Sequence, residues 1–389
     1  MASKRDEHKR RIYEAIRANP GISRNRIARI CRIRPSTVSD LVAQLLSDNL
    51  VLERQAYPSQ GQGRPEIALS PAYSRFVIVG IHIVSKQLKA ILMDASETRL
   101  AEATLLLPDD LDNDGFISNV VDVVQYLIEK RPLYSEVIGV TVIVPGLVRF
   151  EPRIWVLTTR FPSIRHVSID RLEKALQMRV VFKRALDAGL QYLLRKNNQY
   201  ASGGTVLFHW GYGIGAAYAY DGQIMESHKG PVLEIGHFRY NTNATKQCVC
   251  GLVGCLETEA ALWALFPDLE DAVGPLPEDE DAFEVTRAVQ QFAQNPAFDH
   301  AVSSISRAVA SLYAILNPNR FLFIGPFTEK IDIIHRIRDN VLSMIIPSSA
   351  DFFDIETVTV ERGGETVAVS ETLFRERLDE FLVDYSRQS

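Results

Sequence analysis

The segment "EIGHFRYNTNATKQCVCGLVGC", from Glu234 to Cys255, has an unusual concentration of cysteines. It holds three of the chain's four cysteines within eight positions, and His237 lies eleven residues before the first of them. Three thiolates and one imidazole nitrogen complete a closed tetrahedral shell for Zn²⁺, and a closed shell is typical of a structural zinc site. Gly251 and Gly254 lie between the ligands and allow the backbone to turn all three sulfur atoms toward one ion. The spacing therefore predicts a structural Zn²⁺ site with four ligands, His237, Cys248, Cys250 and Cys255.

The composition of the chain bears on the chemistry of these cysteines. The chain has 389 residues, of which 46% are hydrophobic and 23% charged, as expected for a soluble protein of two or three domains. Its first residues, "MASKRDEHKRR", are charged, and no run approaches the roughly 18 apolar residues of a membrane span. We therefore expect a cytoplasmic protein without membrane insertion, in which disulfides are rare. A redox-active thiol pair and cysteines buried for unrelated reasons remain alternatives to zinc.

Charge is distributed unevenly along the chain. Residues 1–70 hold 13 Lys and Arg against 7 Asp and Glu, a net charge of +6. The remaining residues hold 30 against 41, a net charge of −11. A small basic module on an acidic body is what binding to a polyanion such as nucleic acid requires.

The basic module has the pattern of a helix-turn-helix. Apolar residues recur at helical spacing in residues 8–19, 24–32 and 35–50. Ser23 can cap the second helix, and Pro35 can open the third after a tight turn. The residues predicted to face inward are Ile12, Ala15 and Ile16 in the first helix, Ile27, Ala28 and Ile30 in the second, Cys31 beside the turn, and Val38, Leu41, Val42, Leu45 and Leu46 in the third.

The third helix is predicted to lie in the major groove of double-stranded DNA. Its first turn offers polar groups suited to base edges and phosphates, and residues 50–71 then predict two strands with a flexible tip, the wing of a winged helix-turn-helix. An arginine at that tip can enter a minor groove, although such a side chain can also be merely solvated. The alternative for the whole module is a three-helix unit that docks another protein. The candidate DNA-binding residues are Arg34, Ser36, Thr37, Ser39 and Arg64.

From Arg75 onward the chain alternates apolar runs with helical segments, which indicates an α/β body. The runs are "RFVIVGIHIV", "LKAILMD", "VIGVTVIVP", "RVVFKRA", "TVLFHWGYG" and "RFLFIGPF".

The order of several motifs in this body resembles the ROK family of sugar-responsive repressors and sugar kinases. They are "VIVPGLV", "GYGIGAAYAYDGQI", "EIGH", "CVCGLVGCLE" and "NPNRFLFIGP", and the resemblance is greatest to the family's N-acetylglucosamine, xylose and glucose repressors. It implies an actin-like pair of α/β lobes with a cleft between them, and it places His237 between zinc and sugar. We expect a winged helix-turn-helix at residues 1–72, a first lobe at 73–185, and a second lobe at 186–389 whose last helix packs back on the first lobe.

Both phosphate-binding positions of the family's kinases are altered in this chain. The kinases open their first lobe with an Asp and paired glycines, where this sequence has His82, Val84 and Ser85. Neutral His is a poor ligand for Mg²⁺, and a β-branched side chain obstructs the approach of a phosphate. Tyr212 also replaces a small hydroxyl residue in the second loop, "GYGIG". We therefore predict that the protein is not an enzyme and has no catalytic residues.

The sugar positions are better preserved. In the family's kinases an Asn-Asp pair holds sugar hydroxyls, and here the pair is Leu186-Asp187. Three further positions match, so the candidate effector-binding residues are Asp187, Glu234, His237 and Glu257. Glu234 and Glu257 can alternatively serve only to orient the zinc loop.

Together these observations predict a DNA-binding transcriptional regulator, a repressor of carbohydrate genes. It would bind an inverted-repeat operator as a homodimer or higher homo-oligomer and respond to a carbohydrate or sugar-phosphate effector. The signal can alternatively be a transporter protein, as for some repressors of the family. An alternative of another class is a sugar kinase with an added DNA-binding head.

Overall fold

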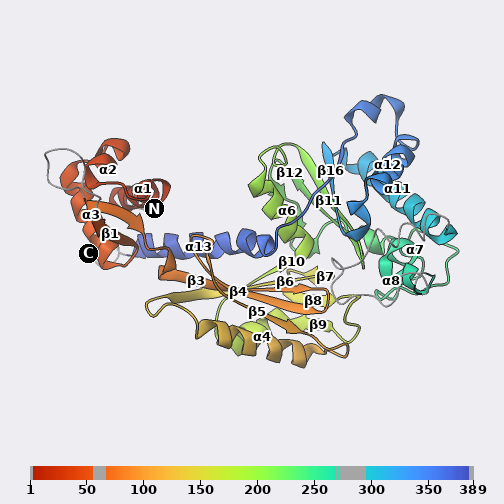
Figure 1. Cartoon of the computed structure of the whole chain (residues 1–389), viewed down its shortest axis with the longest axis horizontal. Helices are drawn as coiled ribbons and strands as arrows, with labels where there is room; N and C mark the ends of the chain where they lie inside the picture. The colour runs from red at the N-terminus through yellow and green to blue at the C-terminus, as the bar shows by residue number, and fades with distance from the viewer. Residues whose placement is uncertain (1–2, 56–66, 269, 271–294, 385–389) are drawn as a thin grey trace.

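The computed structural model describes residues 3–55, 67–268, 270 and 295–384; Arg64 and the predicted wing tip lie outside this range. An N-terminal module and two α/β lobes make up the chain (Figure 1). Among the described residues, no helix combines the length and the apolar composition needed to cross a membrane.

The N-terminal module is a winged helix-turn-helix, as predicted. Ser23 caps the second helix by accepting a hydrogen bond from the Arg26 amide at 3.4 Å. Arg32, with a left-handed φ of 52°, turns the chain toward the third helix. The elements are α1 (Lys4–Ala18), α2 (Arg24–Cys31), α3 (Pro35–Ser47) and the antiparallel strands β1 (Val51–Gln55) and β2 (Ile67–Pro71).

The predicted core of this module is confirmed except at one position. Ile30 was expected to face inward but is 51% exposed. In the eight-residue helix α2, the face that meets the other helices carries Ile27, Ala28 and Cys31, and Ile30 lies beyond the edge of that face. Cys31 is buried in the core, as expected, and Leu46 is half-buried against it.

The first lobe is a five-stranded sheet with strand order β10-β6-β3-β4-β5. Strands β3, β4 and β5 form an antiparallel meander, and β6 and β10 continue the sheet in parallel with β3. A small antiparallel sheet of three strands follows β6 in the chain. The elements are β3 (Phe76–Val84), β4 (Gln87–Asp94), β5 (Arg99–Leu106), α4 (Asn113–Ile128), β6 (Glu136–Val144), β7 (Leu147–Arg149), β8 (Ile154–Leu157), β9 (Arg165–Ser168), α5 (Ile169–Leu176) and β10 (Val180–Arg184).

The second lobe repeats this arrangement with strand order β13-β12-β11-β16-β17. Again an antiparallel meander is extended by two strands parallel to its first strand. The repeated topology confirms the predicted actin-like pair of lobes. The elements are α6 (Ala185–Lys196), β11 (Gly204–Trp210), β12 (Ile214–Tyr220), β13 (Gln223–Ile224), β14 (Glu226–Ser227), β15 (Gly230–Pro231), α7 (Leu256–Ala260), α8 (Leu262–Leu265), α11 (Pro296–Leu316), β16 (Arg320–Ile324), α12 (Ile331–Leu342) and β17 (Ile355–Thr357).

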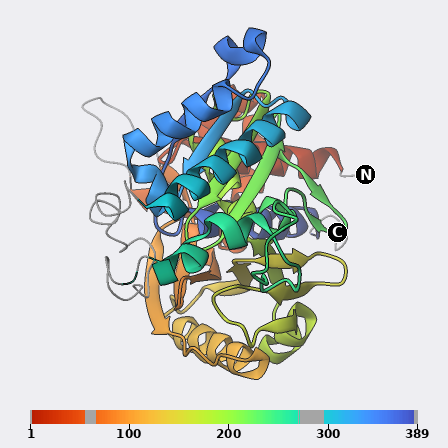
Figure 2. The ribbon, with the colours of Figure 1, turned by 90° about the vertical axis from the view of Figure 1, so that its right-hand side faces the viewer.

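Helices α6 and α13 (Gly364–Asp384) lie between the two sheets, while α4 and α5 cover the outer face of the first and α11 and α12 the outer face of the second (Figures 1 and 2). Residues of β3 alternate between the two faces of the sheet. Val77, Val79 and Ile81 belong to the core under α4, whereas Ile78 packs with Leu373 of α13. The alternation also directs His82 of the same strand toward α13.

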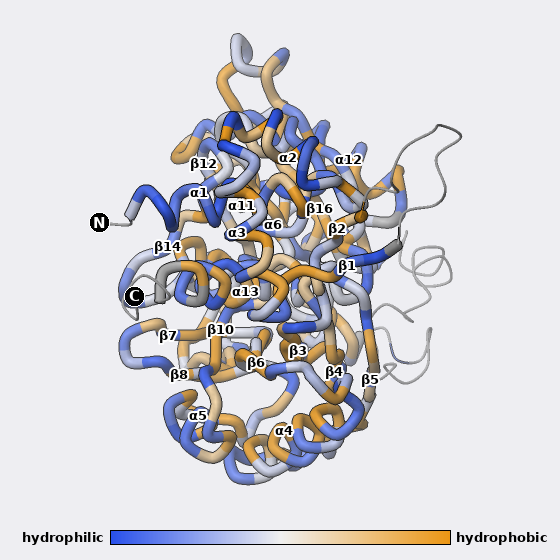
Figure 3. Tube along the Cα trace, turned by 90° about the vertical axis from the view of Figure 1, so that its left-hand side faces the viewer, coloured by the Kyte–Doolittle hydropathy of each residue, from blue (hydrophilic) through white to orange (hydrophobic). Residues whose placement is uncertain are grey.

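Helix α13 joins the body to the N-terminal module. It runs from between the lobes to that module (Figure 1). Leu382 near its end is buried in the core of the module, beside α1 and Phe76. Viewed from the module's side, the start of α1 is strongly hydrophilic, in keeping with its run of charged residues (Figure 3). The domain limits at residues 72 and 185 stay predictions.

Candidate functional site

The N-terminus of α3 carries the side chains predicted to contact DNA. Arg34, Ser36 and Ser39 are exposed there, and Thr37 is half-buried. Arg32, in the turn before this helix, is also exposed and was not predicted. Its left-handed backbone could not be recognised in the sequence, because that conformation is uncommon for arginine. The module thus presents basic and hydroxyl side chains beside one another at the start of its third helix.

The four predicted metal ligands converge, and their ligand atoms all lie within 4.8 Å of one another. The Nδ1 atom of His237 is 3.5 Å from the Cys248 sulfur, and the sulfurs of Cys250 and Cys255 are 3.6 Å apart. Tetrahedral Zn²⁺ with ordinary bond lengths requires about 3.5 Å between nitrogen and sulfur and about 3.8 Å between sulfurs. Gly254, with φ of 78°, allows the loop to close, because a Cβ there would lie 1.9 Å from a backbone carbonyl oxygen. The residues fit a tetrahedral metal ion.

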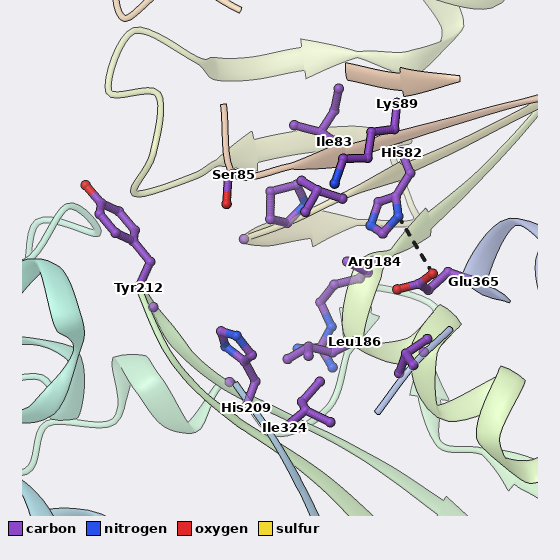
Figure 4. Close-up of a pocket in the computed structure, with 18 of the residues that line it drawn as sticks. His82, Ile83, Ser85, Lys89, Arg184, Leu186, His209, Tyr212, Ile324 and Glu365 are labelled. Carbon is purple, nitrogen blue, oxygen red and sulfur yellow. Dashed lines mark ion pairs between the residues drawn. The ribbon is translucent and has the colours of Figure 1, made fainter. Parts of the chain in front are cut away.

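A cavity of about 1300 Å³ lies between the two lobes. Both phosphate-loop regions line it, as do the start of α13 and the segment after β17 (Figure 4). Glu234, His237 and Glu257, three of the predicted effector-binding residues, line it as well. Asp187 does not, because its carboxylate is buried beneath the cavity wall against Arg184.

Arg184 organises the acidic groups at this wall, a role that sequence reasoning missed. Its guanidinium donates to both carboxylate oxygens of Asp187 at 3.0 and 2.8 Å and to Glu234 at 3.0 Å. A further bond goes to the backbone oxygen of Ala216 at 2.8 Å. Burial lowers the pKa of Arg184, but Asp187 and Glu234 outweigh it and raise the pKa overall. For the acid Glu234, burial has the opposite effect and raises the pKa, and the positive charge of Arg184 opposes that rise.

Glu257 ties the lobes together close to the metal cluster. Its carboxylate accepts hydrogen bonds from the Ile214 amide at 3.2 Å and the Trp263 ring nitrogen at 3.3 Å, both in the second lobe. A third bond comes from the hydroxyl of Thr159 in the first lobe, at 3.3 Å. Because Cys255 precedes Glu257 by two residues, the metal loop and the contact between lobes share one short segment.

The altered kinase positions, His82 and Tyr212, both line the cavity. The Nδ1 atom of His82 is 3.8 Å from a carboxylate oxygen of Glu365 in α13 (Figure 4). Burial lowers the pKa of His82, Glu365 raises it, and nearby Lys89 lowers it, so that the net shift is downward. Across the cleft, the guanidinium of Arg160 lies 3.8 Å from the centre of the Tyr212 ring. Tyr212 belongs to the glycine-rich loop, so this stack covers part of that loop.

Known proteins resemble both parts of the chain. Residues 5–51 match the sequence pattern of winged helix-turn-helix DNA-binding domains, and residues 78–363 match that of the ROK family. The DNA-binding transcriptional repressor Mlc of Escherichia coli K12 is 20% identical over 365 residues, which cover 91% of this chain and 89% of Mlc. The dual regulator NagC of the same strain is 26% identical, covering 64% of this chain and 61% of NagC. The xylose repressor of Caldicellulosiruptor bescii is 23% identical, covering 82% and 85%.

Solved structures share the fold. A ROK family transcriptional regulator homologous to Mlc superposes with a TM-score of 0.71 at 17% identity, covering 97% of this chain and 98% of the other. The ROK hexokinase of Thermus thermophilus superposes with a TM-score of 0.59 at 18% identity, covering 78% and 99%. The sequence pattern spans most of the body, and the lobes, the cleft and the cysteine cluster agree with it. The chain belongs to the ROK family.

Proposed function

We propose that this protein is a DNA-binding transcriptional regulator of carbohydrate genes, a repressor whose hold on its operator changes when a ligand enters the cleft. The relatives Mlc, NagC and the xylose repressor are all transcriptional regulators by name. One observation of this chain carries the proposal: a single helix, α13, begins in the wall of the cavity and ends in the core of the winged helix-turn-helix.

The contacts at the two ends of α13 make it suited to transmit a change. Glu365 and Thr366 in its first turn line the cavity. Leu382, near the other end, is 1% exposed in the core of the N-terminal module, and Asp379 pairs with Arg10 of α1 at 3.0 Å. The helix has 21 residues and therefore spans about 31 Å. A ligand that shifts its first turn thus acts on the module that holds DNA.

The DNA contacts follow from the geometry of α3. A winged helix-turn-helix inserts its recognition helix into the major groove with the first turn toward the bases. In this arrangement Arg34, Ser36, Thr37 and Ser39 contact bases and phosphates; Arg64 lies outside the described residues, and its contact with the minor groove stays a prediction from the sequence.

The cysteine cluster holds Zn²⁺ as a structural ion. His237, Cys248, Cys250 and Cys255 fill all four positions of a tetrahedral shell, so no open position remains for a substrate. The ion would fix the loop from which Glu257 reaches the first lobe.

The effector is a carbohydrate that contacts Glu234 and His237 in the cavity. His237 offers Nδ1 to the metal, which leaves Nε2 on the other side of its ring for a sugar hydroxyl. Glu257 completes this polar end of the cavity. Asp187 acts indirectly in this scheme, because it holds Arg184 in place and Arg184 in turn holds Glu234.

The same cleft is not suited to phosphoryl transfer. That reaction depends on positioned phosphate and metal contacts. Here His82 pairs with Glu365, and the Tyr212–Arg160 stack occupies the second phosphate loop. In a coupled assay with ATP and a panel of sugars, we expect no turnover above background, while the Thermus thermophilus hexokinase provides the positive control. Turnover at an ordinary enzymatic rate would replace the proposal with a sugar kinase.

The decisive experiment is capture and sequencing of genomic DNA fragments bound by the full-length protein. We expect inverted repeats beside carbohydrate genes. Arg34→Ala should weaken binding to a captured site about tenfold or more, since a base contact contributes about 1–3 kcal/mol. Arg338→Ala removes another exposed arginine, from α12, and should leave binding unchanged. Capture without sequence preference would contradict the proposal.

A further inference from the structure

One wall of the cavity is aliphatic. Leu186, Ile324, Val358 and Val360 line it, and all four are only half-buried. They pack against the same hydrophobic cluster in the second lobe, so they form one continuous surface. Gly189, one turn after Leu186 on α6, also lines the cavity, and a Cβ there would make an ordinary contact with Val360 at 3.6 Å. Figure 4 shows Leu186 and Ile324 below Arg184 in the same part of the pocket.

The opposite wall carries charged and titratable side chains. His82 lies between Lys89, its partner across strands β3 and β4, and Glu365, at 3.8 Å. Arg184, at the end of the aliphatic wall, already holds two carboxylates. A phosphate beside Leu186 would lie against alkyl groups, which disfavours a buried anion at that wall, whereas the basic side chains of Lys89, Arg99 and Arg362 line other parts of the cavity.

The cavity is also large for a single sugar. Sites for small molecules usually measure about 300–1000 Å³ and are lined mostly by apolar groups with a few placed polar ones. At about 1300 Å³, this cavity has room for considerably more than a hexose. Glu234 and His237 belong to its polar lining and Leu186 to the aliphatic wall, while further polar residues, among them His82, Lys89 and Arg362, line the rest.

We propose that the cavity takes a glycoside with an apolar aglycone. The sugar hydroxyls contact Glu234 and His237, and the alkyl or aryl aglycone covers Leu186, Ile324 and Val358. This inference rests on the proposed function, in which the cavity is the effector site. Each buried methylene contributes about 0.8 kcal/mol, or about a fourfold gain in affinity. The aliphatic wall thereby selects a substituted sugar over the free one.

Titration calorimetry on the full-length protein tests this with matched probes. Methyl and phenyl glycosides of glucose, xylose and N-acetylglucosamine, in both anomers, differ only in the aglycone. For at least one sugar, we expect the phenyl glycoside to bind at least tenfold more tightly than the methyl glycoside. Ile324→Thr should remove most of that difference. Ile224→Thr makes the same change against the same core cluster but outside the cavity, and should keep it.

Three outcomes would overturn the inference: equal affinities for phenyl and methyl glycosides, a phenyl preference that survives Ile324→Thr, or tighter binding of glucose 6-phosphate than of any glycoside. The fragment capture described above is carried out on the same preparation. Sequence-selective DNA binding combined with any of these outcomes would reject the inference of an apolar aglycone but would still support the proposed function as a regulator. Loss of selective DNA binding would reject the regulator itself.

Discussion

Among single residues, Arg184 supplies the buried positive charge that balances the carboxylates at the wall of the cleft. It is 3% exposed and holds the carboxylates of Asp187 and Glu234. Removing one partner of a buried charge pair leaves the other charge without compensation in a low dielectric and costs about 3–5 kcal/mol. Exposed pairs contribute about 0–1 kcal/mol by comparison. The cleft therefore depends on this one guanidinium far more than on any exposed ion pair.

We expect Arg184→Met to lower the free energy of unfolding by about 3–5 kcal/mol. Arg153→Met is the matched control, because Arg153 pairs with Asp170 and Glu173 at a partly exposed position and should lose about 1 kcal/mol or less. Urea denaturation followed by circular dichroism measures both. Equal losses in the two variants would show that Arg184 is no more than another surface arginine.

A substitution at Cys250 tests the metal cluster. Cys250→Ala leaves three ligands, so we expect the zinc content of purified protein to fall from one ion per chain to almost none. The melting temperature should fall as well, because metal binding is coupled to folding of the loop. Cys31→Ala removes a buried cysteine of the N-terminal module and should leave the zinc content unchanged. Elemental analysis that finds full zinc in Cys250→Ala would contradict the assignment.

Because of His82, we expect the free energy of unfolding to depend on pH. Burial lowers its pKa in the folded protein below the ordinary value of about 6.5, although Glu365 opposes the shift. As the pH falls below about 6.5, the unfolded chain binds a proton that folded His82 does not, so stability is lost toward acid. His82→Gln has no titrating group at this position and therefore does not show this loss of stability. From pH 7.5 to 5.5, wild type should lose stability relative to His82→Gln, by at most about 1.4 kcal/mol per pH unit. Parallel urea curves that show no difference in pH slope would exclude this shift.

At the scale of elements, α13 is placed by a single glycine in β3. A Cβ at Gly80 would lie 1.9 Å from the Thr366 side chain, so α13 can pack this closely only against a glycine. The same contact sets His82 beside Glu365 two residues further along the strand. The register of one helix on one strand thus fixes both the cavity wall and the path to the DNA-binding module.

Gly80→Ala should therefore destabilise the protein by about 1–3 kcal/mol, the usual effect of overpacking. It should also weaken operator binding, although the residue lies in the first lobe. Thr366→Ala in the same chain removes the obstructing methyl group and should restore both properties. Gly189→Ala, whose Cβ would have ordinary contacts at 3.6 Å, is the control. Fluorescence anisotropy with labelled operator measures binding, and failure of the double variant to recover would exclude a steric cause.

The elements themselves were largely predictable, because each is encoded by local periodicity. All six apolar runs form strands, and the cysteine spacing brought its four ligands together. What could not be predicted depends on contacts between distant segments. Arg184 meets Glu234 across 50 positions, and Thr159 meets Glu257 across 98. The prediction that Ile30 faces inward was wrong for a related reason, since tertiary packing decides which face of the short helix α2 is buried.

At the scale of the whole molecule, charge and symmetry limit how the protein can hold DNA. Residues 1–70 carry a net charge of +6 and the rest −11, so DNA is attracted to the module and repelled by the body. A single module offers few base contacts, each with about 1–3 kcal/mol of discrimination. Specific sites need about 4–10 kcal/mol over non-specific DNA. Of the four candidate residues on α3 only Arg34 can make the bidentate contact to which this figure applies, so we expect one copy to reach at most the lower part of that range and a second copy to contribute its own α3.

Two copies related by a twofold axis require an inverted repeat, with half-sites separated by whole turns of about 34–36 Å so that both lie on one face of the duplex. We expect sedimentation to show a dimer and captured fragments to carry such repeats. Inserting five base pairs between the half-sites rotates one of them to the opposite face. This insertion should lower affinity by about a hundredfold or more, since it removes one module's specific contacts. Substituting five base pairs within the spacer, at constant length, is the control and should have a small effect. A monomer in solution, or a lone half-site bound as tightly as the repeat, would show that one α3 suffices and that the twofold arrangement is wrong.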